Sequence, residues 1–425
     1  MRQEEALRLL KSNRSVLLTG EPGSGKTYTV LKYIDWLRSK SIGVAVTAST
    51  GIAATHINGS TIHSWSGIGI KSHLTQSDLR TMCDKRWLVR QARQARVLII
   101  DEISMLSGAT LDLVDQACVA LREDPRPFGG LQVVLVGDFF QLPPVSRQEA
   151  RSEFAFCSMS WQRLAPTVCY LDEKHRQTDE RFLEILAAIR NGAVSAQHIE
   201  LLATRQRSKA ELGPETKVTQ LFCHNADVDR INNSILGQLP GAPREYKMRR
   251  EGQEGMVAAL IRGCPSPETL VLKEGARVLF TKNNPSQGYV NGTVGTVVGY
   301  EKKGGNLPVV QHSEGVKTVV EPAEWVIEAQ GGQRTLAKVV QVPLRLAWAI
   351  TVHKSQGMSL DAAHIDLTRA FEYGQGYVAL SRVRTPAGLT IEGLNERALE
   401  VHPQVLEYDQ ELRRLSAEAE AEPLA

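Results

Sequence analysis

The sequence predicts an α/β protein with two units built on parallel sheets, the second of which is interrupted by a small antiparallel β module. Three observations support this fold class. Between residues 1 and 165, short apolar segments alternate with stretches of helical periodicity, which is typical of a parallel sheet with helices on both faces. Between residues 248 and 342, turn-forming residues multiply around short alternating segments. From residue 343 to 412 the first pattern returns.

Buried strands are expected where short apolar segments stand between turn signals, and helices where apolar residues recur every three or four positions. In the first unit, the expected strands are Val16–Thr19, Gly43–Val46, Val97–Ile100 and Val133–Val136, and the expected helices include Thr27–Lys40 and Ala109–Leu121. Further along, a helix is expected around Phe182–Ile189 in residues 166–247, and strands at Thr219–Cys223, Ala276–Phe280, Thr293–Val298, Ala347–Thr351 and Ala363–Leu367. The acidic, alanine-rich residues 413–425 are expected to be a flexible tail.

Composition places the chain among soluble globular proteins. Its 425 residues, 42% hydrophobic and 23% charged, suffice for two to four domains. No apolar segment reaches the roughly 18 residues of a membrane span, and Met1–Glu5 lacks the apolar core of a signal peptide. The six cysteines form no CxxC pair, which argues against a disulfide framework, a zinc site or an iron–sulfur cluster and fits a reducing cytoplasm.

The segment Gly20–Thr27 fits the GxxxxGK[ST] phosphate-binding loop, and it lies between an expected strand and an expected helix, as that motif requires. Its glycines allow backbone N–H groups to converge on phosphate oxygens, and the helix N-terminus adds partial positive charge. Lys26 is expected to reach the β- and γ-phosphates and Thr27 to bind Mg²⁺. The residues expected to contact nucleotide here are Gly20, Pro22, Gly23, Ser24, Gly25, Lys26, Thr27 and Tyr28. The alternative is a glycine-rich turn.

Two carboxylates, Asp101 and Glu102, directly follow the expected strand Val97–Ile100. A carboxylate at this point faces the Mg²⁺ beside the first strand, so Asp101 is expected to bind the metal and Glu102 to polarise the attacking water. Gln141 comes shortly after a further expected strand, where a neutral amide can sense a γ-phosphate through hydrogen bonds without titrating. The alternatives are a solvated acidic strand end and a turn at which Pro143 stops the strand.

Several further blocks occur in a recognisable order. They are Ile100–Leu106, Pro127–Gln132, Gly137–Val145, Leu171–Gln177, Thr351–Asp361 and Tyr377–Val383. Together they resemble the Pif (petite integration frequency) helicase family, and the segment Leu111–Gln132 is similar to the signature that separates this family from its RecD and Dda relatives. The resemblance extends from about residue 3 to residue 385.

The resemblance implies two RecA-like P-loop NTPase domains with parallel sheets, a small wedge element and an inserted SH3-like β domain. Domain 1A would span residues 1–165 with wedge 1B at about 66–90, domain 2A would span residues 166–247 and 343–412, and the SH3-like domain 2B would span residues 248–342. No residue in Ile68–Arg86 stands out as a strand-separating pin.

Two arginines, Arg176 and Arg382, match family positions that reach the γ-phosphate from the second core. A guanidinium is permanently charged and forks onto phosphate oxygens, so it can stabilise the charge that develops in the transition state. Because Lys26 lies in the first core, these contacts would close the cleft on ATP, and hydrolysis would reopen it. Gln3 resembles the family's adenine-reading glutamine, whose amide can pair with N6 and N7. The alternative for each arginine is a solvated surface charge.

Two polar stretches are expected to hold single-stranded DNA. By resemblance, the DNA contacts are Thr47, Thr50, Gly51, His63 and Ser64 in the first core and Thr351, His353, Lys354 and Ser355 in the second. These contacts go to the DNA backbone, so no strong sequence preference is expected. Because the net charge is only +3, DNA would have to be held in a local groove. The alternatives are a polar loop for residues 47–54 and a structural histidine for His63.

The resemblance therefore implies an ATP-dependent 5′-to-3′ DNA helicase that uses ATP and Mg²⁺ and acts on single-stranded, forked or structured DNA in replication, repair or recombination. Two alternatives stay open: a P-loop ATPase that is not a helicase, such as a recombinase or a signalling switch, and a nucleic-acid-binding module with an inactive ATPase. The blocks Thr351–Asp361 and Tyr377–Arg382 disfavour the first. The intact residues Lys26, Asp101, Glu102 and Arg382 disfavour the second.

Location and assembly are less constrained by the sequence. We expect a monomer in the cytoplasm of a bacterium, associated with the nucleoid, with oligomers on DNA left open. A nuclear or mitochondrial location is expected only for a eukaryotic chain. No residue encodes a preference among forks, G-quadruplexes and RNA–DNA hybrids.

Overall fold

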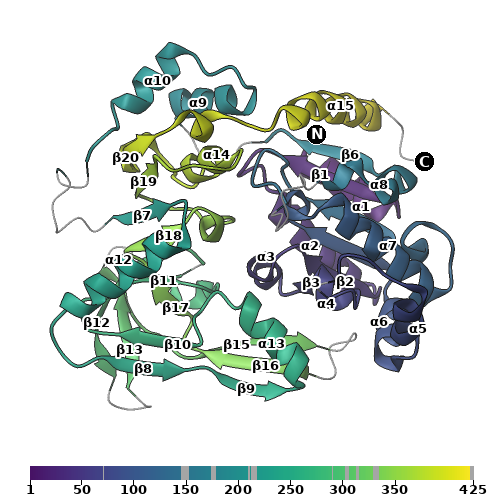
Figure 1. The fold of residues 1–425 in the computed structure, drawn as a ribbon, viewed down its shortest axis with the longest axis horizontal. Coiled ribbons are helices and arrows are strands. Elements are labelled where there is room, and N and C mark those ends of the chain that lie inside the picture. The colour runs from purple at the N-terminus through teal and green to yellow at the C-terminus, as the bar shows by residue number, and fades with distance from the viewer. Residues whose placement is uncertain are drawn as a thin grey trace.

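The computed structural model contains two α/β cores and a β-rich insertion (Figure 1). It describes residues 1–69, 71–144, 153–173, 179–208, 211, 218–289, 291–301, 306–312, 315–328 and 335–421. In Figure 1 the first core contains the purple and blue elements, the second contains yellow and teal elements, and the insertion is green. No helix in the described ranges is both long enough and apolar enough to cross a membrane.

The first core is a six-stranded parallel sheet in the order β3-β2-β4-β5-β1-β6. Its strands are β1 (Val16–Gly20), β2 (Val44–Ala48), β3 (Ser60–Thr61), β4 (Val97–Asp101), β5 (Gln132–Val136) and β6 (Thr167–Leu171). Its helices are α1 (Gln3–Lys11), α2 (Lys26–Ser39), α3 (Gly51–His56), α4 (Ile62–Trp65), α5 (Gln76–Cys83), α6 (Arg86–Gln94), α7 (Gly108–Arg122) and α8 (Met159–Leu164). Strands β1, β4 and β5 are buried along their whole length, as expected of central strands covered on both faces. The strands and helices predicted for this unit are confirmed.

The boundary between the two cores differs from the predicted one. Strand β6 lies beside β1 in parallel register, with Val16 opposite Thr167, so residues 166–171 belong to the first core. Cys169 and Leu171 are buried in the same hydrophobic cluster as the helices on that face. The apolar residues of β6 are evident in the sequence, but the sheet that they join is decided by tertiary packing.

The second core is a four-stranded parallel sheet in the order β18-β7-β19-β20. Its strands are β7 (Thr219–Phe222), β18 (Ala349–Thr351), β19 (Ala363–Leu367) and β20 (Leu389–Leu394). Its helices are α9 (Glu180–Arg190), α10 (Ala196–Ala203), α12 (Asn225–Gln238) and α14 (Gln375–Leu380), with the 3-10 turn η6 (His353–Ser355), and α15 (Pro403–Ala421) follows them. Because β7 precedes the insertion and β18 follows it, the predicted interruption of this unit is confirmed.

The insertion is antiparallel, as predicted, but slightly wider than residues 248–342. It contains a five-stranded sheet in the order β14-β13-β12-β11-β17, a three-stranded sheet in the order β15-β16-β9, and the pair β10-β8. The strands are β8 (Arg244–Lys247), β9 (Arg249–Gly252), β10 (Thr269–Leu272), β11 (Arg277–Phe280), β12 (Val294–Glu301), β13 (Leu307–Gln311), β14 (Lys317–Val319), β15 (Ala323–Glu328), β16 (Thr335–Gln341) and β17 (Leu344–Leu346). Helix α13 (Glu254–Gly263) packs on β16. The SH3-like assignment stays a prediction.

A small helical element lies at the edge of the first core, in the region where the wedge is expected. Helices α5 and α6 pack against α7 there. Thr75 starts α5 with a reciprocal cap, because its hydroxyl accepts from the N–H of Asp78 at 3.1 Å while its own N–H donates to the Asp78 carboxylate at 2.9 Å. The role of this element in strand separation stays a prediction.

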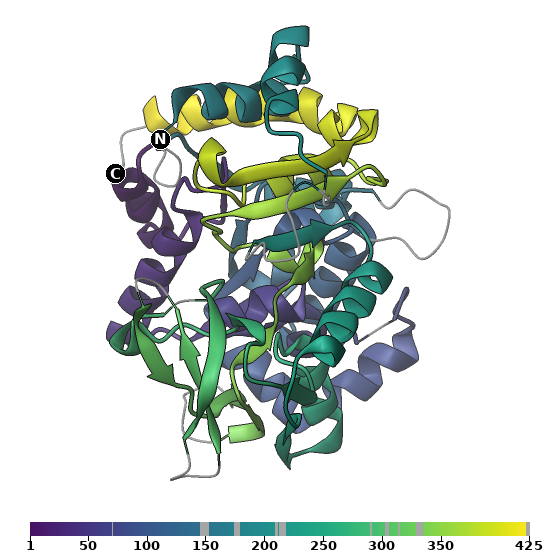
Figure 2. The ribbon, with the colours of Figure 1, turned by 90° about the vertical axis from the view of Figure 1, so that its left-hand side faces the viewer.

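The C-terminal residues up to 421 form a helix, so the flexible tail predicted from residue 413 is wrong over that part. Helix α15 crosses from the second core to the first and packs along β6 (Figure 1), at the opposite end of the molecule from the green insertion (Figure 2). The Ser416 hydroxyl accepts a hydrogen bond from the N–H of Tyr170 at 3.0 Å, and the Tyr408 ring stacks on Phe156 at 4.1 Å between centroids. The composition suggests disorder, but Leu412 and Ser416 lie at helical spacing and form a buried face.

Candidate active site between the two cores

The predicted phosphate loop connects β1 to α2 with the backbone conformation that its glycines allow. Gly20 and Gly25 have φ angles of +142° and +91°. A Cβ atom at Gly20 would lie 2.5 Å from the carbonyl oxygen of Leu171, and one at Gly25 would lie 2.2 Å from Nε2 of Gln3. Both positions therefore require glycine. Helix α2 begins at Lys26, so the positive end of its dipole faces the loop.

Gln3 lies against this loop. Its side-chain Nε2 donates to the carbonyl oxygen of Ser24 at 3.3 Å, and its backbone N–H donates to the carboxylate of Glu173 at 3.1 Å. These contacts hold the start of α1 at the rim of the loop. They bring Gln3 within reach of a nucleotide bound there, while its contact with adenine stays a prediction.

The ammonium of Lys26 lies inside the turn of the loop. Its Nζ donates to the carbonyl oxygens of Gly20 at 2.7 Å and Glu21 at 3.0 Å. Tyr28 is 53% exposed at the mouth of the site, and the Nζ of Lys32 lies 4.4 Å from its ring centroid. The loop thus presents one fixed cation on its inner side and one exposed aromatic ring on its outer side.

The two predicted carboxylates, Asp101 and Glu102, lie at the end of β4. Asp101 is 9% exposed and accepts a hydrogen bond from the N–H of Glu102 at 2.9 Å. Burial raises the pKa of Asp101, although Lys26 lowers it. Burial also raises the pKa of Glu102, the Asp101 charge raises it further, and both Lys26 and Arg382 oppose the rise. Cations from both cores therefore influence the pKa values of this carboxylate pair.

The residues present fit a Mg²⁺ ion that is held jointly with a nucleotide. Asp101 and Thr27 offer oxygen ligands, which Mg²⁺ prefers. Over the described ranges, no group of three or more His, Cys, Asp or Glu residues could hold a metal ion. Mg²⁺ usually takes one or two protein ligands and completes its shell with phosphate and water oxygens. A metal at this site would therefore arrive with phosphate groups.

Gln141 lies at the junction of the two cores, where a second glutamine contacts it. Nε2 of Gln356, which follows η6 in the second core, donates to Oε1 of Gln141 and to Oε2 of Glu102, both at 3.3 Å. Nε2 of Gln141 donates in turn to Oδ2 of Asp138 at 3.5 Å. Gln356 stands in one of the recognised blocks but was not predicted as a site residue, because only the tertiary contact between the cores reveals its position.

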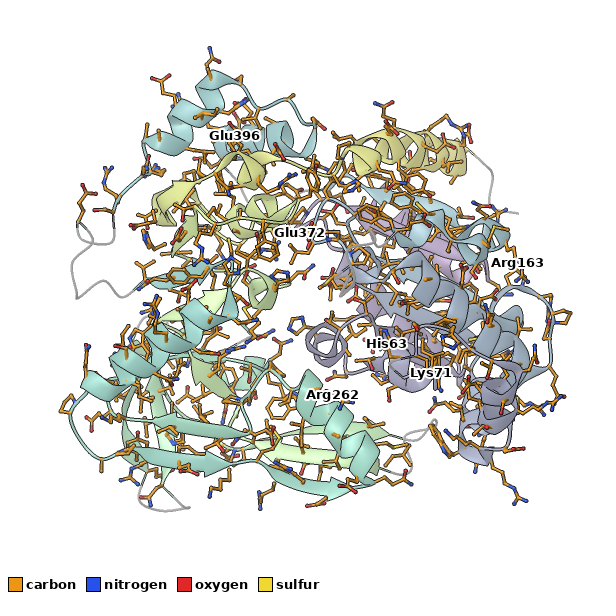
Figure 3. The ribbon with its side chains drawn as sticks, in the orientation of Figure 1. His63, Lys71, Arg163, Arg262, Glu372 and Glu396 are labelled. Atoms are coloured by element: carbon orange, nitrogen blue, oxygen red, sulfur yellow. The ribbon has the colours of Figure 1, made fainter. Side chains whose placement is uncertain are left out.

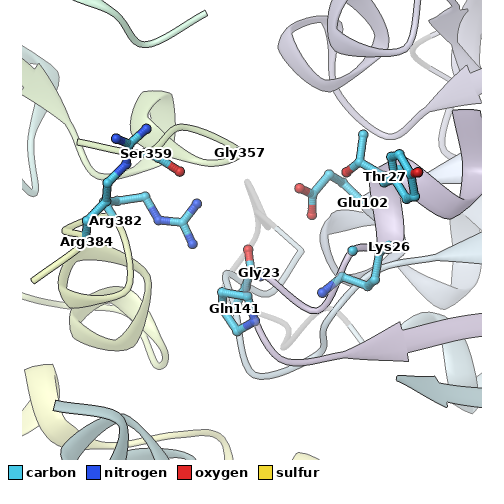
Figure 4. A pocket seen from close by; sticks show the side chains of 12 residues that line it. Gly23, Lys26, Thr27, Glu102, Gln141, Gly357, Ser359, Arg382 and Arg384 are labelled. Carbon is cyan, nitrogen blue, oxygen red and sulfur yellow. The ribbon is translucent and has the colours of Figure 1, made fainter. Parts of the chain in front are cut away.

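Arg382 faces the loop from the second core. Its side chain is held by a hydrogen bond from Nε to the carbonyl oxygen of Val378 at 2.9 Å and one from Nη2 to the hydroxyl of Ser381 at 2.7 Å. Its guanidinium points across the site toward Gln141 and Glu102 (Figure 4). The cavity between the cores is about 430 Å³. Its lining residues are Pro22, Gly23, Gly25, Lys26, Thr27, Tyr28, Glu102, Gln141, Gly357, Ser359, Arg382 and Arg384.

Three of these lining residues, Gly357, Ser359 and Arg384, were not predicted as site residues. Arg384 stands two positions after Arg382 and also forms an ion pair with Asp361 at 2.9 Å. The sequence around Arg384 shows no pattern that distinguishes this arginine from other arginines on the protein surface. Arg176, the other predicted arginine, lies outside the described residues.

The predicted DNA contacts differ in exposure, and three of the side chains are buried. The Thr47 hydroxyl donates to the carbonyl oxygen of Ile99 at 2.5 Å, and the Ser355 hydroxyl donates to a backbone carbonyl of its own turn at 2.7 Å. The Thr351 hydroxyl accepts from the N–H of Lys354 at 3.2 Å. Thr47, Thr351 and Ser355 are each at most 1% exposed, so their side chains are held within the protein, and their contact with DNA stays a prediction.

Other predicted DNA contacts of the first core lie on α3 and α4 and are half-buried. The Thr50 hydroxyl caps α3 by accepting from the N–H of Ala53 at 3.2 Å. Gly51 packs closely on α13 of the insertion, since a Cβ atom at Gly51 would lie 2.1 Å from the Cα of Gly263. Burial lowers the pKa of His63. His63 and Ser64 lie on the side of the first core that faces the insertion (Figure 3).

Phe371 is an exposed aromatic residue beside the predicted DNA contacts of the second core. Its side chain is 54% exposed. Its ring lies near-parallel to His224 at 5.0 Å and to His353 at 6.4 Å between centroids. The three rings follow the C-terminal ends of β7, β18 and β19. Phe371 was not predicted as a site residue because it lies between two recognised blocks.

Comparison with known proteins agrees with this geometry. Residues 3–200 match the family model described as PIF1-like helicase. The ATP-dependent DNA helicase Pif1 of Psychrobacter is 40% identical over 99% of this chain and 72% of its own length. The chain spans less than two thirds of the length of the vertebrate relatives that it matches.

Solved structures of Bacteroides Pif1 match nearly the whole chain at 30% identity. The complex with ADP-AlF4 has a TM-score of 0.84 and covers 97% of this chain and 96% of its own. The structure bound to ssDNA has a TM-score of 0.67 and covers 98% of this chain and 97% of its own. Together with the relative that is 40% identical over 99% of this chain and 72% of its own length, these matches show that the chain belongs to the PIF1-like helicase family.

Proposed function

We propose that this chain is an ATP-dependent DNA helicase that moves 5′-to-3′ along single-stranded DNA and unwinds the duplex ahead of it. The observation that carries the proposal is the cavity between the cores, which Lys26 lines from one wall and Arg382 from the other. A nucleotide in this cavity contacts both cores, so its binding and hydrolysis can change their separation. The direction of movement and the choice of forked or structured DNA rest on the resemblance to the family.

The chemistry follows from the groups on the first wall. Lys26 and the N-terminal end of α2 would hold the β- and γ-phosphates. Thr27 and Asp101 would hold Mg²⁺, which when bound neutralises charge on the phosphates. Glu102 would orient the attacking water and accept its proton, a role suited to a carboxylate with a raised pKa.

The second wall would complete the site as the cores approach. Arg382 would place a permanent charge beside the γ-phosphate in the transition state, and we propose the same role for Arg176. The hydrogen bonds from Gln356 to Gln141 and Glu102 cross between the cores, so they would form only when the cleft is closed. Hydrolysis would then be coupled to the relative movement of the cores.

Single-stranded DNA would lie across both cores, on α3 and α4 of the first and beside η6 of the second. Thr50, Gly51, His63 and Ser64 would contact it in the first core, and His353 and Lys354 in the second. Phe371 would add base stacking, which is worth about 1–3 kcal/mol per base in single-strand binding proteins. Stacking tolerates any base, which fits a motor that follows the strand without reading sequence.

The proposal is tested by unwinding of duplexes that carry either a 5′ or a 3′ single-stranded tail, with ATP and Mg²⁺ supplied. We expect unwinding of the 5′-tailed duplex alone and no unwinding by the Lys26→Ala variant. Unwinding of the 3′-tailed duplex alone would contradict the proposed direction. ATP hydrolysis without unwinding and without stimulation by DNA would favour a P-loop ATPase that is not a helicase.

A further inference from the structure

A buried cation, Arg190, lies at the junction of the two cores. It is the last residue of α9 and is 1% exposed. Its Nη1 donates to both carboxylate oxygens of Asp138, at 2.8 Å and 3.0 Å, and to the Tyr377 hydroxyl at 3.1 Å. Its Nη2 donates to the Tyr170 hydroxyl at 2.8 Å and lies 3.6 Å from the carboxylate of Asp409. One guanidinium therefore joins both cores and α15.

A contribution to folding stability is a weak explanation for the buried ion pair between Arg190 and Asp138. Arg190 and Asp138 are both withdrawn from water, and the face of the guanidinium lies 4.0 Å from the centre of the Phe140 ring. The attraction within a buried pair often does no more than offset the loss of hydration, so an apolar replacement can be equally stable. What the pair does supply is geometric specificity, since a guanidinium fixes the direction of each partner.

The partners of Arg190 connect two walls of the nucleotide cavity. On the first core, Asp138 also accepts a hydrogen bond from Gln141, which lines the cavity. On the second core, Tyr377 lies on α14, the helix that ends at Leu380, two residues before Arg382. The chain of contacts thus runs from the amide of Gln141 to the helix that carries Arg382, and Arg190 is its central link.

We propose that Arg190 is a positioning residue that fixes Arg382 and Gln141 relative to each other when the cleft closes. It acts through Asp138 and Tyr377 and does not touch the nucleotide. The inference deepens the proposed function, since it assumes that a nucleotide occupies the cavity. A misplacement of about 1 Å at a reacting centre can cost on the order of 100-fold in rate, so a second-wall arginine requires such a support.

Arg190→Gln tests this role, with Arg163→Gln as a matched control. Arg163 also pairs with a buried aspartate, Asp115, at 2.8 Å, but it lies within the first core at the outer edge of the molecule (Figure 3). For Arg190→Gln we expect kcat for DNA-stimulated ATP hydrolysis to fall on the order of 100-fold, with KM for ATP changed by less than about threefold. For Arg163→Gln we expect both constants to stay within about twofold of the wild type.

A binding measurement separates this inference from the helicase proposal. Affinities for ADP and for ADP with aluminium fluoride are measured without DNA. We expect Arg190→Gln to bind ADP like the wild type but to lose most of the extra affinity for the aluminium fluoride complex, because that complex needs both walls. A wild type that shows this difference yet never unwinds DNA would defeat only the helicase proposal. Equal loss for both ligands would overturn the positioning role.

Loss of folding is addressed by a double variant and a conservative one. Asp138→Asn combined with Arg190→Gln removes both buried charges, so neither is left without its counterion. If positioning is the role, this double variant folds with kcat still reduced. Recovery of kcat in the double variant would show that the pair serves stability alone. Arg190→Lys, which keeps the charge but lacks the fork, should recover less than about a tenth of kcat.

Discussion

The cleft between the cores and the proposed DNA-binding surface hold their residues in different ways. In the cleft, four predicted residues from separate segments, Lys26, Glu102, Gln141 and Arg382, line one cavity. Among the residues proposed to contact DNA, the hydroxyl of Thr47, which was predicted, is buried in its own core, whereas the ring of Phe371, which was not predicted, is exposed. A nucleotide site needs charged groups at defined positions, and short sequence motifs specify both the residue types and their spacing. A strand-binding surface depends on exposure, which tertiary packing decides.

The largest effect is expected from Lys26→Ala, which removes the cation at the centre of the cleft. We predict that ATP hydrolysis falls by at least about 100-fold, because losing one preorganised hydrogen-bond donor to a developing negative charge already costs an enzyme this much. The affinity for single-stranded DNA should stay within about twofold, because Lys26 lies away from that surface. Steady-state ATPase assays and oligonucleotide anisotropy check the two halves. A parallel loss of DNA affinity would mean that the cleft and the surface are not separable.

Replacing Glu102 by Gln tests the chemistry of the cleft and its pH dependence. Burial and the Asp101 charge raise the pKa of Glu102. A general base must be ionised, so kcat/KM should fall as the pH drops through this raised pKa, above the ordinary value of about 4.3. Glu102→Gln should lower kcat on the order of 100-fold and remove that acid limb. If the acid limb of the pH profile is unchanged in Glu102→Gln, the titrating group is another residue. The control is Glu200→Gln, on the exposed face of α10.

A smaller effect is expected from Phe371→Ala on the DNA-binding surface. Loss of one stacked base should weaken single-stranded DNA binding by roughly 10-fold, with KM for ATP in the absence of DNA unchanged. Phe371→Trp should restore the affinity because it restores a stacking face. Met159→Ala is the matched control, since Met159 is 64% exposed on α8 of the first core. Wild-type affinity in Phe371→Ala, measured by anisotropy, would place the strand elsewhere.

The smallest effect on binding is expected from Thr47→Val. This change keeps the side-chain volume and removes the hydrogen bond to Ile99, so the free energy of unfolding should fall by about 1 kcal/mol. DNA affinity should not change, whereas His63→Ala, at a half-buried position on α4, should weaken it several-fold. Urea unfolding and anisotropy measure the two quantities. If Thr47→Val binds DNA more weakly while its free energy of unfolding is unchanged, the Thr47 hydroxyl contacts DNA.

Most of the fold and the first wall of the site could be predicted from the sequence, for a physical reason. The loop Gly20–Thr27 and the carboxylates at the end of β4 depend on consecutive residues, because local backbone conformation places them. The antiparallel strands of the insertion are likewise indicated by local sequence, namely turn residues between short alternating segments. These features need no knowledge of which segments meet in space.

The remainder depends on contacts between distant segments. Gln356 reaches Glu102 across 254 positions of sequence, and Arg190 reaches Asp138 across 52. Neither residue has a local pattern that marks it as part of the site. The same reason explains the misplaced boundary at β6 and the helix α15, whose buried face exists only because β6 lies beside it.

Single-turnover hydrolysis of ATP by Arg382→Ala, in the presence of single-stranded DNA, tests most directly whether the second core completes the site. We predict that the variant binds nucleotide within about threefold of the wild type but hydrolyses it on the order of 1,000-fold more slowly, because a second-wall arginine acts on charge in the transition state. Arg382→Lys should recover little of the rate, because the ammonium of lysine cannot make the paired hydrogen bonds that a planar guanidinium makes to phosphate oxygens. Hydrolysis by Arg382→Ala at a rate close to that of the wild type would contradict a cleft that works by closing its two cores on ATP.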